Sequence, residues 1–204
     1  MKRFRAIYAL LLLLGAYTSA QGAETAQSVL KHVVERMSTQ PVQATFDLQA
    51  SGMSQKGMIT LHGTRFAVIT ADLSTWYDGK TQWTLVQTVK EVNITEPSRE
   101  ELAETNPLLI LGSLSSDFNA EMAGSGTGAY EILLVARDNK TGIASARVKV
   151  NASTWFPSAI TLHTSTGEQY DIEIKSIKNL NSVPTETFRF NQSAHPGVEV
   201  IDMR

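Results

Sequence analysis

A tight turn at Asp78-Gly79-Lys80 separates two short apolar and aromatic runs, with Trp76 and Tyr77 before it and residues 83–86 after it. An Asp-Gly pair between two such runs is typical of a strand hairpin. A third alternating run, residues 91–94, follows closely. The pattern therefore predicts three consecutive antiparallel strands in the middle of the chain.

The same two-residue period covers much of the remaining chain. Between residues 44 and 50, for example, Phe46 and Leu48 alternate with polar residues. This spacing predicts a meander of about ten antiparallel strands. The predicted strands are residues 44–50, 59–62, 66–68, 76–77, 81–86, 91–94, 130–135, 144–150, 155–162 and 169–177. Residues 52–57 and 124–128 are predicted to be turns, and Phe188 and Phe190 end the strand pattern.

Two helical segments accompany these strands. Residues 26–37 carry apolar side chains about four positions apart, which predicts an amphipathic helix that ends near Pro41. A second helix begins at residues 96–98, breaks at residues 106–107 and continues through Leu111, with residues 115–118 at its end. The predicted fold is therefore mainly β with a helical insert, an α+β arrangement. Because twist accumulates over many strands, we expect a curved antiparallel sheet that closes partly into a barrel.

The first twenty residues have the features of an export signal. Lys2, Arg3 and Arg5 form a basic start, residues 9–14 an apolar core, and residues 18–20 a small-residue cleavage site. Cleavage after Gly22 is the alternative. The apolar run is shorter than the roughly 20 residues that span a bilayer, so we expect a cleaved signal rather than an anchor. Residues 21–204 are then a single exported domain, located in the periplasm.

The chain contains no cysteine. Disulfides, thiolate metal sites and cysteine nucleophiles are therefore excluded, and no cysteine follows the signal to carry a lipid anchor. The formal net charge of −2 provides no basic surface of the kind that nucleic acid requires. Composition thus favours a soluble exported protein that binds no nucleic acid.

Catalytic and metal-binding motifs are not evident. The four histidines, at positions 32, 62, 163 and 195, lie on different predicted elements and lack metal-ligand spacing. Gly112-Ser113 lacks the nucleophile elbow of a hydrolase, and the glycine-rich residues 124–128 lead into a strand rather than into a phosphate-binding helix. We therefore assign no catalytic residue, metal site or cofactor.

The most apolar part of the helical insert is the run Leu108, Leu109, Ile110 and Leu111, directly after Pro107. Four consecutive apolar residues cannot all face one way on a helix, so some face the sheet and others face solvent or a cavity. They either seal one end of the barrel or form a movable lid. Burying each leucine stabilises the closed state by about 1.5–3 kcal/mol, an amount that a lipid could displace.

Several motifs in order resemble those of the periplasmic outer-membrane lipoprotein carriers, the LolA-like family. The motifs are the Trp76–Trp83 hairpin with Asp78-Gly79-Lys80-Thr81, then Glu91-Val92-x-Ile94, Asn106-Pro107-Leu108-Leu109, Phe188-Arg189-Phe190, and Pro196-Gly197-Val198-Glu199-Val200-Ile201-Asp202. The resemblance implies an unclosed, strongly curved antiparallel β-barrel with a helical lid over a hydrophobic cavity. It also implies three partners: lipoproteins bound by their acyl chains, an ATP-driven inner-membrane transporter that releases them, and an outer-membrane acceptor. We expect a monomer that is a carrier rather than an enzyme.

The candidate site follows from the resemblance and the strand pattern together. The predicted lid residues are Pro107, Leu108, Leu109 and Leu111. The family fastens its closed lid with a strand arginine; here His62 stands at that position, so His62 and Arg65 are the candidate latch. The period of two leaves open which strand face looks inward. The predicted cavity lining is Phe46, Leu48, Ile59, Leu61, Phe66, Val68, Trp83 and Leu85.

Two other functions remain open at this point. A sensor or regulatory module could use the same cavity to detect mislocalised lipoproteins, and a co-purifying signalling partner would favour it. A lipid-acting enzyme could work inside the barrel, and turnover that is lost on mutating a cavity serine or histidine would favour it.

Overall fold

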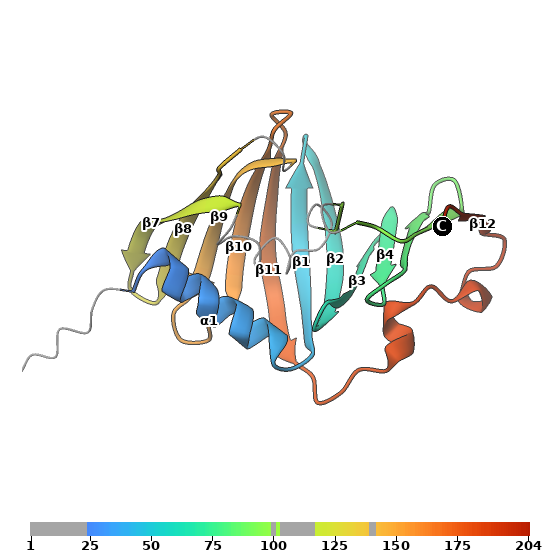
Figure 1. Cartoon of the computed structure of the whole chain (residues 1–204), viewed down its shortest axis with the longest axis horizontal. Helices are drawn as coiled ribbons and strands as arrows, with labels where there is room; N and C mark the ends of the chain where they lie inside the picture. Colours follow the sequence, from blue (N-terminus) through green and yellow to red (C-terminus); the bar gives the residue numbers. More distant parts are fainter. Residues whose placement is uncertain (1–23, 99–100, 103–116, 139–141) are drawn as a thin grey trace, which may run out of the picture.

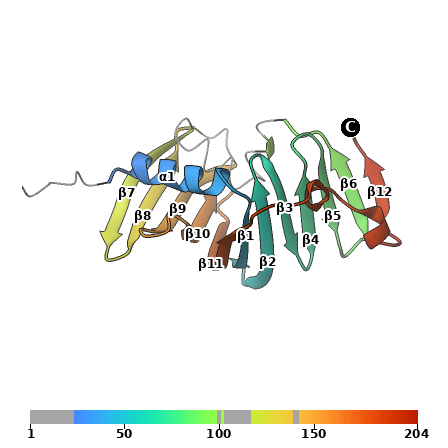
Figure 2. The same cartoon turned by 90° about the horizontal axis from the view of Figure 1, so that it is seen from below.

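One large sheet forms the body of the protein. The computed structural model describes residues 24–98, 101–102, 117–138 and 142–204. Twelve strands pair in the order β12-β6-β5-β4-β3-β2-β1-β11-β10-β9-β8-β7 (Figures 1 and 2). The strands are β1 Val42–Ala50, β2 Met53–His62, β3 Arg65–Thr70, β4 Leu73–Tyr77, β5 Gln82–Val86, β6 Glu91–Thr95, β7 Phe118–Gly126, β8 Ala129–Ala136, β9 Ile143–Asn151, β10 Pro157–Thr164, β11 Gln169–Asn179 and β12 Glu199–Asp202. The edge strands β7 and β12 do not pair with each other, so the curved sheet is unclosed.

The predicted antiparallel meander is confirmed, since ten of the strands overlap the predicted runs. Strands β7 and β12 are additional. The first begins at Phe118, which the sequence pattern placed at the end of the helical insert. The second has only four residues and pairs in parallel with β6, so its conformation depends on a neighbour that is distant in sequence. The turn predicted for residues 52–57 is shorter than expected, because β2 already begins at Met53.

The hairpin at Asp78-Gly79-Lys80 joins β4 to β5 as predicted. Gly79 has φ +104°, a conformation that favours glycine. The Asp78 Oδ1 atom accepts hydrogen bonds from the backbone N–H groups of Lys80 and Thr81, at 3.1 and 3.0 Å. The turn is therefore held by its own aspartate, as in an Asx-turn.

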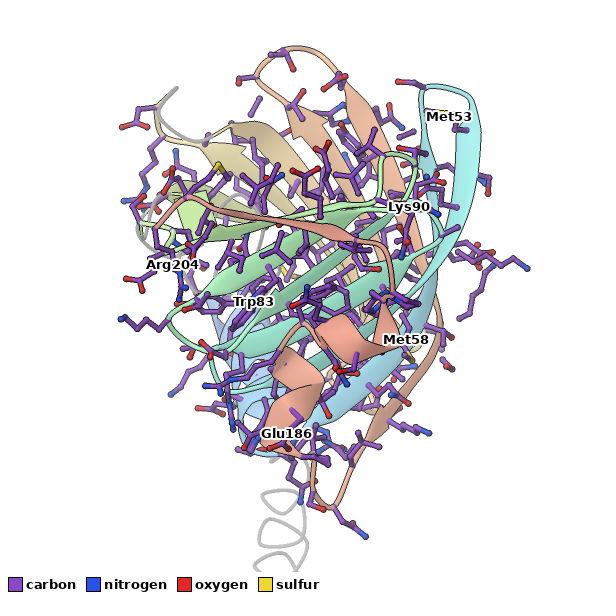
Figure 3. All side chains as sticks on the ribbon, turned by 90° about the vertical axis from the view of Figure 1, so that its right-hand side faces the viewer. Met53, Met58, Trp83, Lys90, Glu186 and Arg204 are labelled. Atoms are coloured by element: carbon purple, nitrogen blue, oxygen red, sulfur yellow. The ribbon has the colours of Figure 1, made fainter. Side chains whose placement is uncertain are left out.

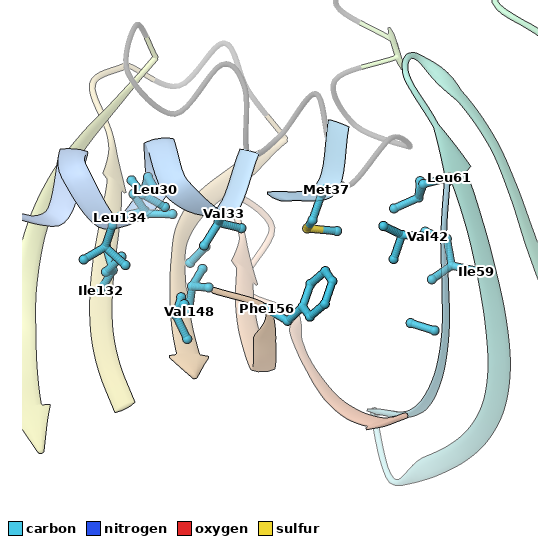
Figure 4. Close-up of a cluster of buried hydrophobic side chains, with 14 of the residues drawn as sticks. Leu30, Val33, Met37, Val42, Ile59, Leu61, Ile132, Leu134, Val148 and Phe156 are labelled. Atoms are coloured by element: carbon cyan, nitrogen blue, oxygen red, sulfur yellow. The ribbon is translucent and has the colours of Figure 1, made fainter. Parts of the chain in front are cut away.

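Helix α1, Ala26–Ser38, packs on one face of the sheet (Figure 4). Its N-cap residue Thr25 accepts a hydrogen bond from the N–H of Ser28 at 3.1 Å. Leu30, Val33 and Met37 are buried and point at side chains of β8, β9, β1 and β2. The amphipathic helix predicted for residues 26–37 is confirmed, and the face of the sheet that it covers is called the helix face below.

A second core lies on the opposite face of β3–β6. Residues 180–198, called the C-terminal segment below, cover this face and include the 3-10 helices η1 Thr185–Phe188 and η2 Gln192–Ala194. Phe188 is fully buried there, against the sheet residues Trp76, Leu85 and Val92. The C-terminal segment therefore covers β3–β6 on the face opposite to the one on which α1 packs.

The start of the second predicted helix is visible at Glu101 and Leu102. The N–H of Ser98 donates to Glu101 Oε2 at 2.8 Å, and the N–H of Glu101 donates to Ser98 Oγ at 3.3 Å. This reciprocal pair is a capping box, and its hydrogen bonds from Ser98 lower the pKa of Glu101. Leu102 is buried in the core on the helix face. Within the described ranges, no helix has the length and apolar character needed to cross a bilayer.

Candidate functional site

Six of the eight predicted lining residues lie together on the helix face. The register of β1 with β2 and of β2 with β3 sets Ile59 opposite Val68 and Leu61 opposite Phe66. Because side chains alternate along each strand, every second residue of these runs projects to the same side. The six are Phe46, Leu48, Ile59, Leu61, Phe66 and Val68.

Burial divides these six into two groups. Phe66 and Leu61 are 0 % and 1 % exposed and belong to the core beneath α1, while Phe46 and Ile59 are almost as deeply buried. Leu48 and Val68 are half-buried at the border of that core. A ligand could therefore reach Leu48 and Val68 with little rearrangement, whereas the deeper four also hold the fold together.

Trp83 and Leu85 lie on the other side of the sheet. Their partners in β4 are Trp76 and Ser74, and Leu85 packs in the core that contains Phe188. In Figure 3, Trp83 lies on the side of the sheet over which the C-terminal segment runs. The structure therefore does not bring these two side chains together with the other six.

A half-buried apolar surface extends the helix face over β1, β11 and β10. Leu48 lies opposite Ile172, which lies opposite Ile160 on its other side. The alternation predicted these strands but did not single out their isoleucines, because apolar side chains of both faces are equally spaced. This surface, called the apolar strip below, consists of Leu48, Ile160, Leu162, Ile172 and Ile174.

Phe46 separates the apolar strip from the core beneath α1. It lies opposite Gly57 of β2, and its ring lies against the glycine backbone so closely that a Cβ at position 57 would overlap the ring. Glycine thus supplies the room that the aromatic ring needs. The ring forms one wall of the accessible apolar surface.

The helix face changes character beyond β3. Val68 lies opposite Thr75, and from there across β5 and β6 the side chains on this face are mainly hydroxyls and amides. Gln82 Nε2 donates to Thr84 Oγ1 at 3.4 Å. We call the set Thr75, Gln82, Thr84, Asn93 and Thr95 the polar strip. It continues the apolar face without a break in the sheet.

The candidate latch residues lie on the opposite face, next to the C-terminal segment. An Arg65 Nη2 atom donates to His62 Nδ1 at 2.8 Å, and the guanidinium lies 5.1 Å from the centre of the Phe188 ring. The predicted lid residues Pro107, Leu108, Leu109 and Leu111 lie outside the described residues. A latch between the lid residues and His62 or Arg65 therefore stays a prediction. The observed contact of Arg65 with Phe188 joins it to the C-terminal segment instead.

The pKa values of Tyr77 and Asp78 are shifted for structural reasons. Burial, followed by the nearby Asp78 charge, raises the pKa of Tyr77. Burial opposes ionisation of Asp78 as well, but hydrogen bonds from Thr81 and Lys80 and the Arg189 guanidinium together lower its pKa. Both groups belong to the β4–β5 hairpin. Among the residues that the structure describes, no three histidine, aspartate or glutamate side chains are grouped so as to hold a metal ion.

A separate hollow of about 460 Å³ lies at the tip of the β1–β2 hairpin. Its lining is mainly polar and includes Gln49, Ser54, Gln169 and Asp171. Met53, 67 % exposed, also lines it at the hairpin tip (Figure 3). The polar lining distinguishes this hollow from the apolar strip.

Comparisons with known proteins agree with this architecture. A family model described as outer membrane lipoprotein carrier protein LolA matches residues 16–166. No curated protein sequence matches the chain. An uncharacterized conserved protein from Thermus thermophilus has a similar fold, with a TM-score of 0.60 and 14 % identity over 87 % of this chain and 98 % of that one.

Two further solved structures are more distant. A LolA superfamily protein from Nitrosomonas europaea has a TM-score of 0.44 and 13 % identity, over 82 % of this chain and 99 % of that one. The MucA/MucB complex of Pseudomonas aeruginosa contains a chain with a TM-score of 0.44 and 13 % identity, over 81 % of this chain and 61 % of that one.

Proposed function

Since this chain belongs to the outer membrane lipoprotein carrier family LolA, we propose that it is a periplasmic carrier that binds lipoproteins by their acyl chains. LolA-like proteins form a binding and carrier family rather than a known enzyme family. In this proposal residues 1–20 are removed on export, and residues 21–204 act as a monomer without a cofactor. The carrier takes lipoproteins from an ATP-driven inner-membrane transporter and passes them to an outer-membrane acceptor.

The apolar strip is the observation that supports acyl-chain binding most directly. Its five side chains come from three adjacent strands and remain half-buried beside a core that is otherwise closed. A contiguous and incompletely covered apolar surface of this kind is typical of an interaction site. Phe46, Ile59, Leu61, Phe66 and Val68 back this surface and extend it toward β3.

The energetics of the cargo fit such a surface. An acyl chain of about 16 carbons in water costs on the order of 10 kcal/mol, at roughly 0.8 kcal/mol for each methylene group. Apolar contact recovers much of this cost without directional bonds. Cargo held in this way can be released when an acceptor offers another apolar environment, which is what a carrier requires.

The test compares neighbouring residues on opposite faces of β10. Leu162 belongs to the apolar strip, and His163 is exposed on the other face. Leu162→Gln should weaken binding of a fluorescent palmitoylated peptide about tenfold, because it places an amide among the acyl contacts. His163→Gln should bind the peptide as the wild type does.

Circular dichroism and urea unfolding establish that both variants are folded before binding is compared. Equal affinities of two folded variants would show that the apolar strip does not hold acyl chains. Loss of affinity in the Leu162 variant alone supports the carrier assignment.

A further inference from the structure

Basic residues are distributed unequally between the two faces of the sheet. All six lysines and arginines of the described strands project to the face opposite α1. Several are paired there: Arg147 Nη1 lies 2.6 Å from Glu131 Oε1, and Lys175 Nζ lies 2.7 Å from Glu173 Oε2. The six residues are Lys56, Arg65, Arg147, Lys149, Lys175 and Lys178.

The helix face of the described strands therefore carries no lysine or arginine. Its charged side chains are Glu91 and Glu199, which lie opposite each other in the parallel β6–β12 pair. The basic residues of α1 have other contacts. Lys31 pairs with Glu35 and is largely exposed, and the Arg36 guanidinium lies 4.7 Å from the centre of the Phe156 ring.

An amphiphile whose chains lie on the apolar strip and extend over β2 and β3 would present its head to the polar strip on β4–β6. A phosphate there would lose hydration without gaining the charge-assisted hydrogen bonds that lysine or arginine supplies, and Glu91 would repel it. Esters, amides and hydroxyls can instead exchange hydrogen bonds with Thr84 and Asn93, which are half-buried. The face thus favours a neutral head.

We infer that the helix face selects acylated polypeptides over anionic phospholipids with the same chains, with the polar strip holding the ester- and amide-bearing head. This inference rests on the proposed acyl-chain binding and adds the basis of its specificity. The observation behind it is the separation of charge between the two faces. The polar strip provides neutral hydrogen-bonding groups where a phospholipid carrier would need cations.

The test is a competition assay with the mature chain, residues 21–204. A fluorescent dipalmitoylated peptide without charged side chains is displaced by its unlabelled form, by dipalmitoylglycerol, or by dipalmitoyl phosphatidylglycerol. We expect half-displacement to require at least about a tenfold higher concentration of phosphatidylglycerol than of the unlabelled peptide. This ratio corresponds to the loss of one charge-assisted hydrogen bond. Dipalmitoylglycerol should fall between the two, because it has ester groups but no peptide amides.

A gain-of-function variant makes the test sharper. Thr84→Lys places a cation in the polar strip and should improve phosphatidylglycerol binding about tenfold, while peptide binding changes little. The matched control is Thr45→Lys, an exposed position on the opposite face, which should alter neither affinity. Asn93→Lys gives the same test at a second position if the Thr84 variant does not fold.

The outcomes separate the two proposals. If the three amphiphiles bind equally and a lysine at position 84 or 93 does not improve phosphatidylglycerol binding, the selectivity is refuted while acyl binding stands. Equal affinities for peptide and dipalmitoylglycerol would refute the assignment of the head to a polypeptide. If none of the three binds, the carrier proposal fails and the inference fails with it.

Discussion

Arg189 donates a hydrogen bond from Nε to Asp78 Oδ2 at 2.9 Å, and its Nη2 atom forms an ion pair with the same oxygen at 2.8 Å. The other oxygen of Asp78 accepts the backbone N–H groups of Lys80 and Thr81. One aspartate therefore closes the β4–β5 hairpin and also anchors the C-terminal segment, whose arginine is 111 positions away. The Asp78 side chain is only 10 % exposed, so water competes little for these bonds.

Asp78→Asn should destabilise the protein by about 1.5–3 kcal/mol, the range for hydrogen bonds to charged groups. The asparagine carbonyl can still accept the turn N–H groups, so the loss reports mainly on the contact with Arg189. The measurement is the free energy of unfolding in urea. Asp202→Asn is the control: this side chain is 48 % exposed, and its contact with Arg204 should contribute less than about 1 kcal/mol. Equal effects of the two substitutions would contradict a special role for Asp78.

The stabilisation by Asp78 should also depend on pH. The pKa of Asp78 is lower in the folded protein than the value of about 3.9 expected in the unfolded chain. A lowered folded-state pKa gives stability that is present above the unfolded value and is lost as the pH falls through the folded value. The difference in unfolding free energy between wild type and Asp78→Asn should therefore be constant near neutral pH and shrink below about pH 4. A difference that does not change with pH would show that ionisation of Asp78 contributes nothing.

Strand existence could be predicted from the sequence, whereas the facing of the strands could not. Alternation located Phe46 and Leu48 on a strand, and it located Trp83 and Leu85 equally well. It could not reveal that the first pair faces α1 and the second pair faces Phe188, because both sets have the same period. Which side chains of β3–β6 point away from α1 is evident only from the C-terminal segment, which packs on these strands although it is distant in sequence.

Parts of the site were missed for the same reason. Ile172 of β11, with Ile160 of β10 beyond it, lies beside Leu48 only because β11 pairs with β1, a contact between residues more than 120 positions apart. The parallel pairing of β12 with β6 is also non-local, and four residues carry too little pattern to predict it. The hairpin at Asp78 was predictable because its determinants are adjacent in sequence.

The contact between Phe46 and Gly57 provides a further prediction. Gly57→Ala should displace the Phe46 ring and destabilise the protein by about 1–3 kcal/mol, as overpacking of a core does. Adding Phe46→Leu to this variant should recover part of the loss, because the smaller side chain leaves room for the new methyl group. Urea unfolding of the two single variants and the double variant measures the coupling.

The control for that experiment is Gly124→Ala in β7. A Cβ at position 124 would meet only ordinary contacts, with Glu131 Oε2 at 3.8 Å as the nearest atom. This substitution should change stability by less than about 0.5 kcal/mol, as surface changes usually do. If the Gly57 and Gly124 variants behave alike, or if Phe46→Leu brings no recovery, the ring does not depend on the glycine.

Phe188 should determine whether the C-terminal segment stays on the sheet. It is fully buried among Trp76, Leu85 and Val92, and Phe188→Ala should cost about 3–5 kcal/mol. The neighbouring Glu186 is exposed in η1 (Figure 3), so Glu186→Ala should leave stability nearly unchanged. Acrylamide quenching of tryptophan fluorescence should increase in the Phe188 variant alone, because release of the segment uncovers Trp76, whose ring lies 5.6 Å from that of Phe190.

Acyl-peptide binding should persist in this variant wherever it remains folded, since the apolar strip is on the other face. Loss of binding by a folded Phe188 variant would instead show that the two faces are coupled.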